Sequence, residues 1–232
     1  MIMNDISIPY DNKAVMALGE HRDSILSALL DIVRAKYAEA HFCCGCLMNL
    51  SGIDDEKEFL LRFEPLESTQ PTSENLALGN PLHNPLSLLR SVETYLVACM
   101  LPDPGIAQNN NLIVTKGLAA QSAVAMLHNL TVSTDAAVLV ANTQIPTVLA
   151  TFVQNSPRMV CKWNRGSLED GALSLLVELT NYPEARQAMM PQAEKLCECL
   201  EKVSSERGIY GMRAAAITCH LKETAVQHQA HP

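Results

Sequence analysis

The densest group of potentially reactive side chains lies at residues 41–46, where the sequence reads His-Phe-Cys-Cys-Gly-Cys. Cys43 and Cys46 form a C-x-x-C pair beside His41, and thiolates and imidazoles at such a spacing bind zinc or carry out thiol redox chemistry. No second C-x-x-C pair or His pair completes a zinc signature in the sequence. Core packing within a helix is the competing interpretation, because a buried cysteine behaves as a small hydrophobic residue.

A second group of side chains is basic and aromatic. The only tryptophan, Trp163, lies with Arg158, Lys162 and Arg165 in the segment 158–166 of a chain that is acidic elsewhere. Tryptophan and arginine are enriched among the residues that dominate binding at protein interfaces. We expect this segment to be a loop that contacts a partner; alternatively, Trp163 folds back on the adjacent helix and the charges are solvated.

Signatures of nucleotide-binding enzymes, metalloproteases and hydrolases are absent from the sequence, which contains no G-x-G-x-x-G, G-x-x-x-x-G-K, H-E-x-x-H or G-x-S-x-G. We therefore expect no enzymatic activity, no cofactor and no bound metal. With 25 acidic and 17 basic residues the formal net charge is −8, which argues against binding to the phosphate backbone of a nucleic acid.

No apolar run approaches the roughly 18 residues of a membrane-spanning helix, and the first residues do not form a secretory signal. We therefore expect a chain that does not insert into membranes and that is intracellular, in the cytoplasm, the nucleus or both.

The composition favours helices as the elements that position these side chains. Hydrophobic residues make up 48% of the chain and aromatic residues only 4%, and the apolar residues are mostly Leu, Ala, Val and Met. These are good helix formers, whereas strands are enriched in aromatic and β-branched residues. The sequence predicts an all-α fold.

A repeated pattern refines this prediction. Segments 43–52, 122–137 and 171–185 each contain a small-residue helix that ends in L-x-[NE]-L-[ST], and 212–224 is a weaker copy. The third position of the pattern is occupied in turn by Asn49, Asn129, Glu178 and His220. Their spacings are 80, 49 and 42 residues. The last two resemble the period of about 40 to 47 residues of stacked helical repeats.

The repeats divide the chain into four expected units within a single solenoid over residues 11–225. The long second unit is explained by two loop insertions, 64–84 and 102–111, which are rich in Pro, Asn and Ser. Residues 1–10 and 226–232 are expected to be flexible termini. The four units span residues 11–51, 54–131, 134–180 and 183–225.

In these units the chain resembles the armadillo repeat family. The segments NTQIPTVLATFV (142–153) and NYPEARQAMMPQAEKLCECL (181–200) look like the junction at which a short first helix turns into a second one. The resemblance implies a right-handed superhelix of stacked helix triplets. It also implies that the third helices line a concave groove, in which Asn side chains hydrogen-bond the backbone of an extended peptide.

Two features of the sequence depart from the family pattern. Only Asn49 and Asn129 match the groove asparagines, and a purely structural role for them, capping or crosslinking neighbouring helices, remains an alternative. Family members that receive nuclear localisation signals carry a Trp one turn earlier. Here those positions hold Gly45, Ala125, Ser174 and Ala216, so we do not expect such a receptor.

Taken together, the sequence predicts a non-enzymatic scaffold that binds a partner peptide or protein in the groove of an armadillo-like solenoid. One alternative is a fragment or end-piece of a larger solenoid, such as a nuclear-transport or chaperone-cofactor protein. Another is a thiol or metal protein that uses Cys43 and Cys46. The expected partner-binding residues are Asn49, Asn129, Glu178 and His220 in the groove, with Arg158, Lys162, Trp163 and Arg165 as a second contact.

Overall fold

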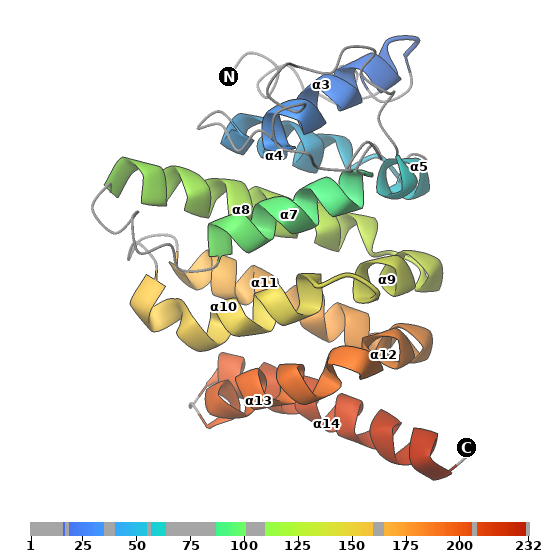
Figure 1. Ribbon diagram of the computed structural model, residues 1–232, viewed down its shortest axis with the longest axis vertical. Helices are drawn as coiled ribbons and strands as arrows, with labels where there is room; N and C mark the ends of the chain where they lie inside the picture. The colour runs from blue at the N-terminus through green and yellow to red at the C-terminus, as the bar shows by residue number, and fades with distance from the viewer. Residues whose placement is uncertain are drawn as a thin grey trace, which may run out of the picture.

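The computed structural model describes residues 16, 19–34, 40–54, 57–63, 87–100, 110–159, 165–205 and 208–230. Every regular element in these ranges is a helix, which confirms the all-α fold class (Figure 1). The helices are α3 (Arg22–Arg34), α4 (Ala40–Leu50), α5 (Lys57–Arg62), α7 (Leu88–Met100), α8 (Asn110–Leu130), α9 (Thr134–Ala141), α10 (Ile145–Met159), α11 (Arg165–Asn181), α12 (Pro183–Met189), the 3₁₀ turn η2 (Met190–Gln192), α13 (Ala193–Ser204) and α14 (Ile209–Ala230).

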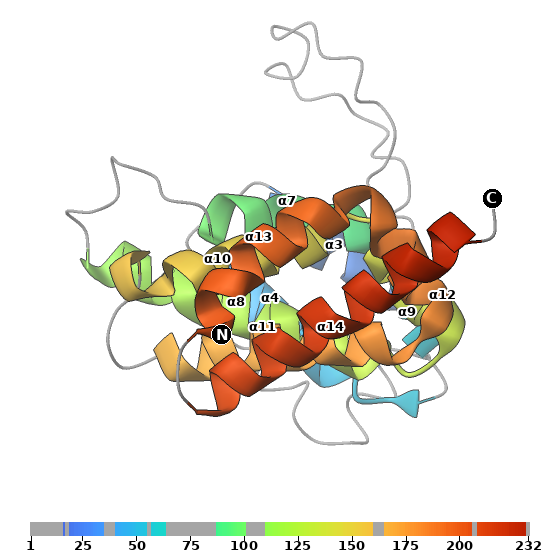
Figure 2. The same cartoon turned by 90° about the horizontal axis from the view of Figure 1, so that it is seen from below.

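The described helices pack in rows that run along the long axis of the molecule. Helices α4, α8, α11 and α14 each contact the next and form one row, called here the α8 row. Helices α3, α7, α10 and α13 form a second row in the same way, and α9 packs on α12 at the side. Figure 2 looks along this axis from the C-terminal end and shows α12, α13 and α14 as the last helix of each row.

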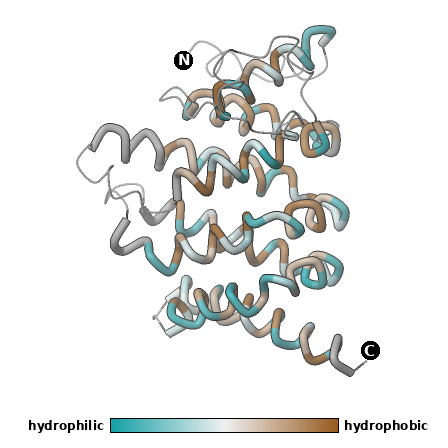
Figure 3. Tube along the Cα trace, in the orientation of Figure 1, coloured by the Kyte–Doolittle hydropathy of each residue, from teal (hydrophilic) through white to brown (hydrophobic). Residues whose placement is uncertain are grey.

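Helix α13 shows how the sequence determines which helix face is buried. Its buried residues recur at the spacing of an amphipathic helix and include Leu196, Leu200 and Val203. Charged residues such as Glu194 and Lys202 lie on the opposite, exposed face. The same alternation of apolar and polar positions is visible along the helices in Figure 3. A helix of this kind is stabilised mainly by packing its apolar face on a neighbour.

Helix α11 is different because it has neighbours on several sides, contacting α8, α10, α12 and α14. Its buried residues include Leu173, Leu175, Leu176 and Leu179, which spread over more than one face. Small residues such as Ala172 lie between them and let the helices approach closely. Apolar residues all round a helix are expected when the helix is enclosed by others.

The hydroxyl that closes each of the first three copies of the repeated pattern has a structural role. These hydroxyls belong to Ser51, Thr131 and Thr180, and all three side chains are buried. Each donates a hydrogen bond to a backbone carbonyl three or four residues earlier, with O···O distances of 2.7, 2.7 and 2.9 Å. The last carbonyls of a helix lack partners within the helix, so these bonds satisfy groups at the helix end.

Two polar side chains join segments that are far apart in the sequence. The buried carboxylate of Glu93 on α7 accepts a hydrogen bond of 2.6 Å from the backbone N–H of Gln144, just before α10. The side-chain amide of Gln192, just before α13, donates to the backbone carbonyls of Ala141 and Thr143 at 2.9 and 3.0 Å. Each bridge uses a side chain to satisfy backbone groups about 50 residues away in the sequence.

The last two helices are separated by a glycine whose conformation requires it. Gly208 has a φ of 106°, in a region that residues with a side chain rarely adopt. Helix α14 begins at the next residue.

Three loop or terminus expectations need correction. Asn110, placed in the insertion 102–111, is the first residue of α8, because asparagine is favourable at a helix start when apolar residues follow. Arg158 and Arg165, placed in the loop 158–166, belong to the ends of α10 and α11. Pro157 and Gly166, next to these arginines, usually interrupt helices. They destabilise a terminal turn less than a helix interior, because backbone groups in that turn lack helical hydrogen-bond partners anyway.

At the C-terminal end, α14 continues to Ala230 through part of the expected flexible segment 226–232. Residues 226–230 contain no glycine or proline that would interrupt the helix. The insertion 64–84 and residues 1–10 lie outside the described residues, and the division into four units stays a prediction.

In the described part of the chain, no single helix is both long and apolar enough to cross a membrane. Helix α9 and Ile145–Asn155 of α10 form a bent pair with 68° between its halves. Taken together, the two helices have the length and apolar composition of a membrane-spanning segment.

We predict that Phe152→Ala lowers the free energy of unfolding by about 3 to 5 kcal/mol, because Phe152 is among the largest fully buried side chains and its truncation leaves a cavity. Chemical denaturation measures this change. Val132→Ala is the control, since Val132 is 56% exposed and should change stability by no more than about 0.5 kcal/mol. Equal effects of the two substitutions would contradict the packing described for α10.

Candidate functional site

The four residues expected to line a groove lie on the four successive helices of the α8 row. Asn49 is on α4, Asn129 on α8, Glu178 on α11 and His220 on α14. Each side chain is half-buried. The row therefore carries one of these residues per helix, and the surroundings of each differ.

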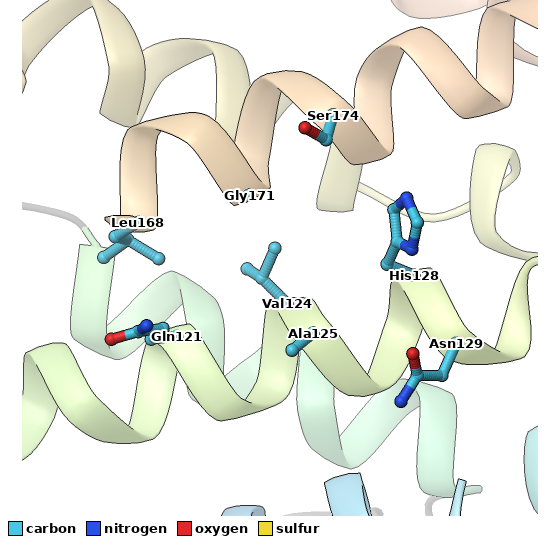
Figure 4. Close-up of a pocket in the computed structure, with 8 residues that line it drawn as sticks. All are labelled: Gln121, Val124, Ala125, His128, Asn129, Leu168, Gly171 and Ser174. Atoms are coloured by element: carbon cyan, nitrogen blue, oxygen red, sulfur yellow. The ribbon is translucent and has the colours of Figure 1, made fainter. Parts of the chain in front are cut away.

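A pocket of about 280 Å³ opens between α8 and α11 and includes Asn129 (Figure 4). Helix α8 contributes most of its wall, and α11 contributes the facing side. Among the expected site residues, only Asn129 lines it. The lining residues are Gln121, Val124, Ala125, His128, Asn129, Leu168, Gly171 and Ser174.

Small side chains leave this pocket open. Ala125 lies one turn before Asn129, and Ser174 lies one turn before Glu178. Gly171 has no side chain, and a Cβ atom built there would lie 3.4 Å from the Cγ1 atom of Val124. Larger residues at these positions would fill the space between the two helices.

The side-chain amide of Asn129 has two roles. Its Nδ2 atom donates a hydrogen bond of 3.2 Å to the Oγ atom of Ser51, the residue that follows α4. The expected structural alternative, a crosslink between neighbouring helices, is therefore present. The amide oxygen points the other way, toward α11 and the pocket (Figure 4). The crosslink thus fixes an amide whose acceptor faces the pocket.

Asn49 lies near the C-terminal end of α4, where its backbone carbonyl accepts a hydrogen bond of 3.3 Å from the N–H of Gly52. It is not among the residues that line the pocket between α8 and α11. A role in binding for Asn49 stays a prediction.

Glu178 belongs to a small polar cluster at the end of α11. Its carboxylate accepts a hydrogen bond of 3.4 Å from the side-chain amide of Asn181. Burial raises the pKa of Tyr182, and the charge of Glu178 together with its hydrogen bond to Tyr182 raises this pKa further. Glu178 therefore interacts with the residues three and four positions after it.

His220 occupies the last of the four positions. Its Nδ1 atom is buried and has no hydrogen-bond partner in the described ranges. Its backbone carbonyl accepts a hydrogen bond of 2.9 Å from the hydroxyl of Thr224. His220 is not among the residues that line the pocket between α8 and α11.

Sequence reasoning missed an ionic bridge next to the pocket. Arg213 on α14 donates to Asp170 on α11 at 2.5 Å, and to the hydroxyl of the pocket residue Ser174 at 3.1 Å. The separations along the chain, 43 and 39 residues, are close to the 42-residue interval of the repeat. A search for complementary polar residues one repeat apart would have found this bridge.

Sequence reasoning also missed Gln121. Gln121, Ala125 and Asn129 are four residues apart and therefore lie on one face of α8. Helical periodicity applied backward from Asn129 would have predicted this position.

The proposed basic contact is largely outside the described residues. Lys162 and Trp163 belong to the segment 160–164, whose structure is not described. Arg158 and Arg165 belong to α10 and α11 through their backbones. Contact of this group with a partner stays a prediction.

The cysteines near His41 lie within the packed interior. Cys43, Cys44 and Cys46 are only 6%, 2% and 0% exposed on α4, which favours the core-packing interpretation. Within the described ranges, no group of three or more His, Cys, Asp or Glu residues is placed to hold a metal ion.

Two further cysteines have thiols that resist ionisation. Burial raises the pKa of Cys197, and the hydrogen bond to Glu223 raises the pKa of Cys219. A thiol is nucleophilic as a thiolate, so a raised pKa lowers its reactivity at neutral pH.

Comparison with known proteins gives no match to this chain, whether with family models, with curated proteins or with solved structures. The resemblance to armadillo repeats therefore stays a prediction from the sequence.

We predict that Glu178→Gln lowers the pKa of Tyr182, because it removes the negative charge that disfavours the tyrosinate. Tyrosinate absorbance measured against pH, with Tyr182→Phe to identify the signal, tests this. Because the folded-state pKa lies above the ordinary value of 10.0, the contribution of Tyr182 to stability is full below that pH and is lost as the pH rises through the folded-state pKa. Identical titration curves for wild type and Glu178→Gln would contradict the interaction between Glu178 and Tyr182.

Proposed function

We propose that the chain is a right-handed α-solenoid of about four armadillo-like repeats. Two consecutive units support this proposal most strongly, 134–180 and 183–225. In each, a short helix is followed by a longer second helix and then by a helix of the α8 row. Corresponding helices of the two units pack on each other: α9 on α12, α10 on α13 and α11 on α14. Stacking of equivalent elements is how repeat proteins build a continuous core.

The function that we propose is non-enzymatic binding of an extended peptide, or an extended segment of a partner protein, along the α8 row. The observation that carries this proposal is the pocket between α8 and α11, into which the oriented amide of Asn129 faces. An amide side chain offers a donor and an acceptor, as a peptide bond does, so it can hold a backbone without reading its sequence.

The neighbouring helices would extend this binding surface. Glu178 lies one turn after the pocket residue Ser174, and Asn49 and His220 lie on the helices at either end of the row. Helices pack about 10 Å apart, so four of them span roughly 40 Å and accommodate about 12 extended residues. Arg158, Lys162, Trp163 and Arg165 remain the proposed second contact.

We predict that the double substitution of Asn49→Ala and Asn129→Ala weakens binding of an extended peptide by about 1 to 3 kcal/mol, because backbone hydrogen bonds to the peptide are lost. Short random peptides displayed on phage and selected on the full chain provide the ligands, and calorimetry provides the affinities. Unchanged affinity with unchanged helicity would contradict a groove held by these amides.

Ser51→Ala is the matched control for this experiment. It removes the acceptor of the Asn129 crosslink but leaves both asparagines in place. If Asn129 acts by contacting the peptide, Ser51→Ala reduces the affinity much less than Asn129→Ala does. Equal losses would mean that Asn129 acts only by joining α4 to α8.

A second candidate, that the chain is part of a larger solenoid, is favoured by the outer face of α14. Ile209, Met212 and Val226 are 52%, 67% and 67% exposed. Their spacing places them on one side of the helix. Repeat proteins need a polar outer face on their terminal repeats, whereas this side of α14 exposes three large apolar side chains beside the polar Glu223 and Gln227.

If α14 normally packs on a further element, the isolated chain should associate as its concentration rises, and Met212→Glu should suppress this by placing a charge on the apolar face. Sedimentation velocity measures the association. Val132→Glu is the control, because Val132 is also exposed but lies between α8 and α9. A monomer at every concentration would contradict this candidate.

A further inference from the structure

We infer that the pocket between α8 and α11 takes the side-chain carboxamide of one glutamine from the extended partner segment. The segment itself runs across the stacked helices, from α8 to α11, and the glutamine side chain enters the hollow between them. This inference rests on the proposed function and adds to it the chemical class of one partner residue.

The lining of the pocket is divided into polar and apolar parts (Figure 4). Its polar end lies nearer the C-termini of the two helices and is formed by His128, Asn129 and Ser174. Gln121 lies at the other end. The wall between them consists of residues with apolar side chains or none, namely Val124, Ala125, Leu168 and Gly171. A neutral side chain with an aliphatic stem and a polar head matches this division.

The hydrogen-bond direction at Asn129 is fixed by its neighbour Ser51. The hydroxyl of Ser51 donates to the carbonyl of Met48 at 2.7 Å, so its oxygen must accept the bond of 3.2 Å from the Asn129 nitrogen. The amide oxygen of Asn129 therefore faces the pocket (Figure 4). This oxygen has two lone pairs, so it can accept one N–H from a glutamine head as well as one backbone N–H of the segment.

Ser174 supplies the opposite polarity from α11. The guanidinium of Arg213 can only donate, so the oxygen of Ser174 accepts the bond of 3.1 Å between them. The hydroxyl proton of Ser174 has no acceptor among the residues that the structure describes. It is therefore available to donate to an oxygen that enters the pocket.

A carboxamide joins these two groups across the helices. Its NH₂ group donates to the oxygen of Asn129, and its oxygen accepts from the hydroxyl of Ser174. Two hydrogen bonds of about 2.9 Å that meet at one carboxamide span the space between facing side chains of helices whose axes lie about 8 to 10 Å apart. The imidazole of His128, exposed at the same end, can add a further donor or acceptor.

Other anchors leave polar groups of the pocket unpaired. An aliphatic side chain would exclude water from Asn129 and Ser174 without bonding them, and a buried polar group without a partner is costly. A carboxylate has no N–H for the oxygen of Asn129. A lysine or arginine meets no carboxylate among the lining residues, and Asp170 beside the pocket is already neutralised by Arg213.

The size and position of the pocket suit one side chain of a crossing segment. Its volume of about 280 Å³ is below the roughly 300 to 1,000 Å³ typical of small-molecule sites. Helices lie about 10 Å apart and an extended chain advances about 3.3 Å per residue, so about one residue in three lies over the gap between two helices. The two methylene groups of a glutamine in this gap would cover Val124 and Gly171.

Random peptides displayed on phage and selected on the full chain test this inference. The selected peptides should share one glutamine. Its replacement by methionine, which is of similar length but lacks the amide, should weaken binding by about tenfold in calorimetry. Replacement by glutamate, which has the same shape but no N–H for Asn129, should weaken binding by about tenfold or more.

Ser174→Ala distinguishes a contact with the glutamine from a general effect on the fold. It should weaken binding of the glutamine peptide by about three- to tenfold and that of the methionine peptide by less than about twofold, because only the first loses a hydrogen bond. Ser205→Ala is the matched control and should change neither affinity. Ser205 is exposed at the end of α13, where its hydroxyl donates to the carbonyl of Lys202.

The outcomes separate the inference from the proposed function. Selected peptides that share no glutamine, that tolerate methionine in its place, or that respond equally to Ser174→Ala with either residue would overturn the glutamine anchor and leave the peptide-binding scaffold in place. If the selection yields no peptide that binds at millimolar concentration, both the scaffold and the anchor are wrong.

Discussion

The close packing of helix on helix along the α8 row is the constraint on which the rest of the structure depends. Helix α11 is enclosed by α8 on one side and α14 on the other, with α10 behind it. Enclosure requires leucines to fill the interior and small residues to let the backbones approach. A segment of this composition has no single polar face, so it acquires a stable position only when its neighbours are in place.

This constraint also explains how a pocket arises in a packed structure. Small residues are needed where two helices approach, but at the surface of the contact they leave space that no neighbour fills. Ala125, Gly171 and Ser174 lie at this edge between α8 and α11. The same small residues therefore allow the helices to pack closely inside the row and leave the pocket open at its surface.

The sequence was sufficient to predict that the chain forms helices, but not which side chains meet between them. Local signals in the sequence agree with the helix ends, since Pro183 is the first residue of α12 and Gly208 directly precedes α14. Asn129 was recognised by its place in a repeated pattern, but the pattern does not say that its nitrogen is bonded to Ser51. Spacing along the chain marks Arg213 and Gln121 as candidate positions, but which residues their side chains meet depends on which helix faces which in the assembled rows.

The bridge from Arg213 to Asp170 and Ser174 gives the structure a mechanical property. It ties a wall of the pocket to the last helix of the row across the α11–α14 contact. Both bonds come from the same guanidinium nitrogen of Arg213, so a single side chain of α14 fixes the carboxylate of Asp170 and the hydroxyl of the pocket residue Ser174 relative to each other. The wall that α11 gives to the pocket is thus joined to a helix that does not itself line it.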